Sequence, residues 1–246
     1  MFELQNSQPQ QAEDLELQAG PKESTVLVQM NPRLGFVRKV YGILCYQLLI
    51  TTFICFLSMK VPSFLKFQVE NYWLFVATTV VCLFILCLLM CVKKYSRQVP
   101  INYILLTIFT LCEAYTVSMI CGFSDPTIVV MAAAMTLGIT LGLTIYAYTT
   151  KRDFSVIGSF MFMVLSSFLL TFLFFMFFSY EASYVLFSWV GAFIYGIYII
   201  YDTQLILGGR HEELGMDDYI LGAIIIYVDI IALFLRILQI LNSVKK

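Results

Sequence analysis

Seven apolar stretches follow Arg38 and Lys39, and each is close to the roughly 20 residues that a helix needs to cross about 30 Å of hydrocarbon. The stretches are residues 40–59, 72–92, 101–121, 127–149, 155–179, 183–207 and 220–241. The chain is 60% hydrophobic and 13% charged, whereas soluble domains are about half apolar and a quarter charged. The sequence therefore predicts an all-α membrane protein with seven transmembrane helices.

The segment before the first apolar stretch has a different composition. Residues 1–30 carry mostly acidic charges and few aromatic side chains, which predicts a disordered tail, with residues 31–246 forming the membrane domain. Basic residues gather on one side of the predicted helices, and the positive-inside rule puts that side and the N-terminus in the cytosol. Seven crossings would leave the C-terminus outside the cytosol, whereas a re-entrant last segment would return Lys245 and Lys246 to it.

Several classes of function are excluded by the sequence. The net charge is −1 and no basic stripe is interleaved with aromatic residues, so no nucleic acid partner is expected. The chain has no GxSxG, Walker A, HExxH or GxGxxG motif, which argues against hydrolase, nucleotide-binding and zinc-protease chemistry. We therefore expect a protein that is not an enzyme and that uses no cofactor.

Four ionisable side chains lie inside the apolar stretches: Glu113, Asp202, Asp229 and Arg236. A charge at the middle of a bilayer costs about 3 kcal/mol on insertion scales, so such groups face a protein interior, pair with each other or line an ion or proton path. The two aspartates lie on the last two stretches, which a short loop joins. This pattern predicts an acid-gated ion path.

The two aspartates are the centre of this hypothesis. Two carboxylates in one poorly solvated site cannot both ionise easily, so Asp202 and Asp229 would share a proton and titrate as a unit. The protonated pair would hold the last two helices together, and the fully ionised pair would attract a hard cation such as calcium. The alternative is a structural role in which the aspartates bind Tyr201, Tyr227 or Thr203 without any transport.

The other two groups leave more than one interpretation open. Glu113 either belongs to the ion path or is satisfied by Tyr115 and Thr116. Arg236 follows Asp229 by seven residues, which is about 10 Å along a helix and too far for a direct pair. The arginine therefore either forms a latch with another partner such as Glu113 or extends to the membrane surface.

Four short motifs carry a resemblance to a known family. They are Phe36-Val37-Arg38-Lys39-Val40-Tyr41, Lys151-Arg152-Asp153-Phe154-Ser155, Tyr201-Asp202-Thr203 and Tyr227-Val228-Asp229-Ile230-Ile231. With them, residues 33–241 closely resemble the Bax-inhibitor or lifeguard family, nearest its Golgi anti-apoptotic branch. The combination of YDT and YxDII on adjacent helices at the end of the chain is specific.

The resemblance implies a fold and several site residues. It implies seven helices with the last helix central in the bundle, and a pH sensor formed by Asp202 and Asp229. It also implies that Asp217 in the loop and Glu113 in the third helix belong to the ion path. A latch follows less directly from the resemblance, because this sequence departs from the family pattern at two places. Segment 72–92 lacks the arginine of bacterial relatives, and Arg236 comes one turn earlier than usual.

The resemblance also implies an activity. The expected function is a pH-sensitive calcium leak channel in the Golgi or endoplasmic reticulum membrane that lowers store calcium and inhibits apoptosis. Its partners would be the lipid bilayer, calcium as the transported ion, protons, and apoptosis-regulating or calcium-channel membrane proteins. Two rival functions are a non-conducting regulator of cell death that binds other proteins and a proton-coupled cation transporter.

Overall fold

The structure is a computed structural model that describes residues 21–152, 154, 164, 181–208 and 214–245. These residues form eight helices and no strand. The helices are α2 (Pro21–Lys60), α3 (Pro62–Glu70), α4 (Tyr72–Cys91), α5 (Lys93–Arg97), α6 (Ile101–Gly122), α7 (Pro126–Thr149), α9 (Glu181–Leu207) and α10 (Tyr219–Lys245). The predicted all-α class is confirmed for this part of the chain.

Six of the helices are long and apolar enough to cross a membrane. The six spans are Arg33–Lys60, Tyr72–Cys91, Ile101–Gly122, Pro126–Thr149, Val185–Leu207 and Tyr219–Lys245, and each corresponds to one predicted stretch. The predicted stretch 155–179 lies outside the described residues except at Val164. The count of seven spans therefore stays a prediction, as does the division of the chain at residue 30.

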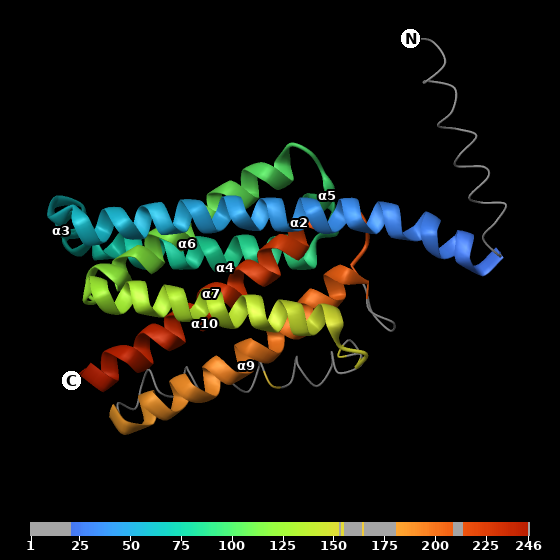
Figure 1. Cartoon of the computed structure of the whole chain (residues 1–246). Helices are drawn as coiled ribbons and strands as arrows, with labels where there is room; N and C mark the ends of the chain where they lie inside the picture. The colour runs from blue at the N-terminus through green and yellow to red at the C-terminus, as the bar shows by residue number, and fades with distance from the viewer. Residues whose placement is uncertain (1–20, 153, 155–163, 165–180, 209–213, 246) are drawn as a thin grey trace, which may run out of the picture.

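The long helices lie roughly along one common direction, as Figure 1 shows, with α5 at one end of the bundle and α3 and the C-terminus at the other. Helix α10 packs against α2, α5, α6, α7 and α9. In the most apolar window of α10, 67% of the residues are buried, against 17–44% for the other spans. Among the described helices, α10 therefore lies deepest in the bundle.

Helix α10 is also continuous from one end of the bundle to the other. Its 27 residues correspond to a length of about 40 Å. At its end, the amide of Asn242 donates a hydrogen bond to Ser124 at 3.0 Å and Lys245 forms an ion pair with Asp125, between α6 and α7. The two ends of α10 therefore lie at opposite ends of the bundle.

Helices α7 and α9 lie side by side and run in the same direction. The amide of Gln204, near the end of α9, donates to the carbonyl oxygens of Ala147 and Arg152 at 3.5 and 2.9 Å. Its Oε1 accepts from the backbone N–H of Phe154 at 2.7 Å. The end of α7 is thereby fixed beside the end of α9, which carries Asp202.

Two short helices, α3 and α5, occupy segments between the predicted spans. Helix α3 has a proline, Pro62, in its first turn, where the missing N–H costs nothing. Its Gln68 is buried, accepts a hydrogen bond from Ser58 at 2.7 Å and donates one to Ser118 at 2.9 Å. These contacts attach α3 to α2 and α6, so α3 forms part of the packed bundle.

Candidate functional site

The side chains of Asp202 in α9 and Asp229 in α10 are close neighbours inside the bundle. Both residues are buried, with 8% and 6% of their surface exposed. An ionised carboxylate has no hydrogen to donate, so a hydrogen bond between two carboxyls requires a proton on one of them. Among the described residues, the Oδ2 atom of Asp229 has no hydrogen-bond partner. The geometry therefore suits a pair of acids that holds one proton.

One alternative partner of the aspartates is engaged elsewhere. The hydroxyl of Tyr227 lies 2.8 Å from the hydroxyl of Thr51 in α2. Tyr227 is fully buried, and its ring meets the edge of the Phe109 ring with centroids 6.1 Å apart. These contacts of Tyr227 link α10 to α2 and α6 and involve neither aspartate.

Glu113 lies in α6, apart from the aspartate pair. Its side chain is partly buried and lies beside Cys82 of α4, whose thiol donates to the carbonyl oxygen of Phe109 at 3.6 Å. The hydroxyl of Thr116 donates to the carbonyl oxygen of Cys112 at 3.1 Å, so this neighbour has a partner of its own. The three acids of the membrane segments therefore form two groups, the pair between α9 and α10 and the single Glu113 between α4 and α6.

Arg236 contacts neighbours on α9 and α10. Its guanidinium lies 4.8 Å from the centre of the Phe187 ring in α9 and donates a hydrogen bond to Gln239 at 3.3 Å. A cation over an aromatic ring is stabilised by the ring quadrupole. The contacts described for Arg236 and Glu113 do not join them, and a latch formed by Arg236 stays a prediction.

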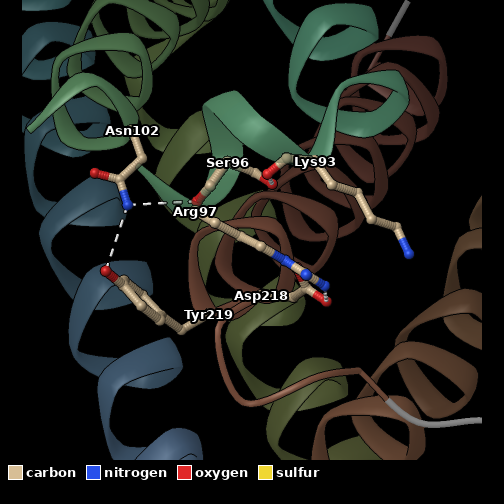
Figure 2. A network of polar contacts seen from close by, with 6 residues as sticks. All are labelled: Lys93, Ser96, Arg97, Asn102, Asp218 and Tyr219. Carbon is tan, nitrogen blue, oxygen red and sulfur yellow. Dashed lines mark hydrogen bonds and ion pairs between the residues drawn. The ribbon is translucent and has the colours of Figure 1, made fainter. Parts of the chain in front are cut away.

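The two acids before α10 differ sharply in environment. Asp217 is exposed, whereas the side chain of Asp218 is only 7% exposed. Both oxygens of Asp218 accept hydrogen bonds from Arg97 in α5, from Nε at 2.7 Å and from Nη2 at 2.8 Å, as Figure 2 shows. Sequence reasoning singled out Asp217 and missed this ion pair, because the two partners are 121 residues apart.

The ion pair also shifts the titration of Asp218. The hydrogen bonds from Arg97 lower the pKa of the Asp218 carboxyl, and the charges of Arg97 and Lys93 lower it further. In the same network, the Asn102 amide donates to the carbonyl oxygen of Ser96 and to the hydroxyl of Tyr219, both at 3.3 Å. Figure 2 shows these side chains meeting where α5, α6 and the start of α10 converge. Asp218 is therefore an ionised group in a firmly bonded position.

A second arginine contacts the end of α9, where the chain that leads to α10 begins. Arg33 in α2 donates to the carbonyl oxygens of Leu205 at 2.6 Å, Ile206 at 2.9 Å and Leu214 at 2.7 Å. The last carbonyls of a helix lack partners within the helix, and a cation there is favoured by the helix dipole. The end of α9 is therefore stabilised by a side chain from α2.

The two aspartates alone offer too few ligands to hold a calcium ion firmly. In the part of the chain that the structure describes, no cluster of three or more His, Cys, Asp and Glu residues could hold a metal ion. Calcium takes about six to eight oxygen ligands, and Asp202 with Asp229 supplies only a share of them. Water or backbone carbonyls would have to complete the coordination of any ion at this pair.

Comparisons with known proteins identify relatives over nearly the whole chain. The family described as inhibitor of apoptosis-promoting Bax1 matches residues 33–246. The chain is 35% identical over 232 residues to protein LIFEGUARD 1 of Arabidopsis thaliana, covering 93% of this chain and 95% of that protein. It is 35% identical over 214 residues to protein lifeguard 4 of Mus musculus, covering 87% of each. It is 33% identical over 223 residues to the Golgi anti-apoptotic protein of Vaccinia virus (strain Lister), covering 91% of each.

Proposed function

This chain belongs to the family of inhibitors of apoptosis-promoting Bax1, and we propose that it is a pH-sensitive calcium leak channel gated by Asp202 and Asp229. It is a multi-pass membrane protein of an anti-apoptotic family. The name of the viral relative supports a location in the Golgi membrane and a role in inhibiting apoptosis. Release of calcium from an internal store would lower the store calcium on which this role depends.

One observation carries the proposal: two buried carboxyl groups from different helices meet inside the bundle. With one shared proton, the pair joins α9 to α10. Without it, two negative charges remain close together, and two unit charges about 4 Å apart repel by about 4 kcal/mol at an effective dielectric constant of about 20. Such a repulsion changes a two-state equilibrium roughly a thousandfold, so loss of the proton would separate the helices and favour entry of a cation.

The remaining acids extend the proposed path. Asp217 is exposed at the end of the bundle where α10 begins, and Glu113 is partly buried on α6. Acids along a narrow path favour cations over anions. Under the positive-inside rule the end with Lys93, Lys94 and Arg97 faces the cytosol, together with the N-terminus. Arg236 would act as a latch nearer the opposite end.

The test is calcium efflux from vesicles that contain the purified protein, measured with a calcium indicator over a series of pH values. Wild-type efflux should depend on pH, and Asp202→Asn and Asp229→Asn should each flatten this dependence because the pair can no longer lose its shared proton. Glu70→Gln, which changes an exposed acid on α3, should leave the dependence unchanged. A wild-type pH dependence in both aspartate variants would exclude this gate.

The same preparation separates the rival functions. A proton-coupled transporter needs a counter-gradient of protons, whereas a leak releases calcium with no opposing ion supplied. A regulator that acts only by binding proteins would show no efflux. Deletion of residues 1–30 should leave efflux intact, while a regulator that uses its acidic tail would lose partner binding.

A further inference from the structure

We propose that Arg33 and Arg97 are positioning residues for the Asp202–Asp229 pair, with Arg33 fixing the end of α9 and Arg97 fixing the start of α10. The inference rests on the proposed function, since it assigns these arginines to the same gate. The hydrogen bonds described for the two arginines do not reach either aspartate. They act on the backbone ends of the two helices that carry them.

Arg33 fixes the turn of α9 that follows Asp202. Its guanidinium donates three hydrogen bonds to the carbonyl oxygens of Leu205, Ile206 and Leu214, with N···O distances of 2.6–2.9 Å. Leu205 and Ile206 come three and four residues after Asp202, which is one helical turn. Because Leu214 lies beyond the end of α9, the same guanidinium also fixes the chain that approaches α10.

Arg97 fixes the residue from which α10 begins. Asp218 directly precedes α10, and its carbonyl oxygen accepts the hydrogen bond of the Gly222 N–H at 2.9 Å. Its own N–H donates to the carbonyl oxygen of Gly215 at 2.9 Å. The planar guanidinium of Arg97 donates one hydrogen bond to each carboxylate oxygen of Asp218, and two parallel bonds fix the orientation of the carboxylate as well as its distance. The first turn of α10 is therefore attached to α5.

The backbone at Gly215 lies close to the ion pair between Arg97 and Asp218. A Cβ atom added there would lie 3.0 Å from Oδ2 of Asp218 and 3.6 Å from Nη2 of Arg97. The first distance is shorter than ordinary van der Waals contact, so a side chain would displace the carboxylate. A side chain at residue 215 would therefore crowd the ion pair.

The register of the two helices explains why such attachment matters. Helices α9 and α10 run in opposite directions and pack along each other. A shift of one residue moves a side chain about 1.5 Å along the axis, which exceeds the distance range of about 0.5 Å over which a hydrogen bond is well formed. Axial fixing of both helices by α2 and α5 therefore decides whether the two carboxyls meet.

The test uses the full-length protein in nanodiscs and infrared spectroscopy of the protonated carboxyl band over a pH series. Asp202→Asn and Asp229→Asn assign the part of the band that belongs to the pair. The infrared absorbance assigned to the pair should be mostly lost, or should change over a different pH range, in each of the variants Arg97→Gln, Asp218→Asn and Arg33→Met. The double variant with Arg97→Gln and Asp218→Asn should show no more than either single change, because both remove one interaction.

The ion pair at the other end of α10 provides a matched control. Asp125 and Lys245 also join a loop to α10, but both are more exposed than Asp218, at 38% and 59%. Asp125→Asn and Lys245→Gln should leave the carboxyl band and its titration as in wild type. Equal effects at the two ends of α10 would overturn the specific role of Arg97.

Conservative variants cover the case in which the others fold poorly. Arg97→Lys and Arg33→Lys keep the charge but lose the planar guanidinium, and each should displace the titration less than the neutral variants do. Wild-type titration in all arginine variants would overturn the proposal. Because the infrared band reports the pair without calcium, wild-type protein that releases no calcium would contradict the channel and leave the positioning test intact.

Discussion

The hydroxyl groups of Thr51 in α2 and Tyr227 in α10 lie 2.8 Å apart in the interior of the bundle. The Thr51 hydroxyl donates its hydrogen to the carbonyl oxygen of Gln47 at 2.9 Å, so Tyr227 is the donor in the contact between them. The Gln47 side chain in turn donates to the hydroxyl of Thr110 in α6 at 3.1 Å. A chain of polar contacts therefore joins α10, α2 and α6.

Tyr227→Phe should lower the free energy of unfolding by about 0.6 to 1.7 kcal/mol, the range of single hydrogen bonds between membrane helices. The ring is kept, so packing against Phe109 is retained and only the hydroxyl contact is lost. Denaturant unfolding in detergent micelles measures the change. Tyr148→Phe, at a residue that is 75% exposed, should have little effect, and equal losses in both variants would contradict the role of the buried contact.

Gly122→Val should destabilise the protein by about 1 to 3 kcal/mol, the usual cost of overpacking. A Cβ atom at Gly122, the last residue of α6, would lie 2.5 Å from Leu65 of α3 and 2.7 Å from the hydroxyl of Ser58. The side chains of Leu65 and Ser58 would have to shift to make room for the valine. Thermal unfolding checks the prediction.

Gly138→Ala is the control for that experiment, because a Cβ atom there would meet nothing within 4 Å. Alanine is favoured over glycine in a helix by up to about 1 kcal/mol. The control should therefore be neutral or stabilising. A Gly122 variant as stable as wild type would show that α3 is not closely packed there.

The ion pair between Arg97 and Asp218 should stabilise the fold at neutral pH and lose this effect in acid. Bonding to Arg97 lowers the folded-state pKa of Asp218 below its ordinary value of 3.8. The contribution is therefore complete above that value and disappears as pH falls through the lowered folded-state pKa. The free energies of unfolding of wild type and Asp218→Asn should differ at pH 7, and the difference should shrink as the pH falls from 3.8 through the lowered folded-state pKa.

The exposed pair of Lys66 and Glu70 provides the comparison for this pH series. Its atoms are 3.6 Å apart and both side chains are more than half exposed, and such pairs contribute little to stability. Glu70→Gln should match wild type at every pH. If Asp218→Asn differs from wild type by the same amount at acid and neutral pH, the effect does not arise from the ion pair.

Glu113→Gln should reduce calcium efflux about tenfold, the equivalent of about 1.4 kcal/mol, if this acid attracts the ion within the path. Glu113 contacts Cys82, away from the aspartates, so the pH at which efflux changes should stay as in wild type. The vesicle assay reports both quantities. Wild-type efflux in this variant would remove Glu113 from the ion path, and a displaced pH response would show that it is coupled to the pair.

The membrane spans could be predicted from sequence because hydropathy is a local property. The predicted stretch 101–121 differs from α6 by one residue, and 220–241 falls within α10. The short helices α3 and α5 were not predicted, since nine and five residues are too few for an apolar period to emerge. Pro62, in the first turn of α3, was the local signal that could have indicated its start.

The candidate site also has a part that could be predicted from the sequence and a part that could not. Asp202 and Asp229 were recognisable because a charge within an apolar stretch is conspicuous and a short connection brings neighbouring helices together. The bonds from Arg97 to Asp218 and from Arg33 to Leu214 join residues 121 and 181 positions apart. Such pairings depend on how helices pack, and no periodicity in the sequence encodes them.

The buried carboxylate of Asp218, just before the first residue of α10, holds this end of the helix on α5 through its ion pair with Arg97. With this end fixed, α10 cannot slide along its own axis past the helices that surround it. Any opening of the bundle at α10 must therefore come from rotation about its long axis, or from a sideways swing of α9 away from it.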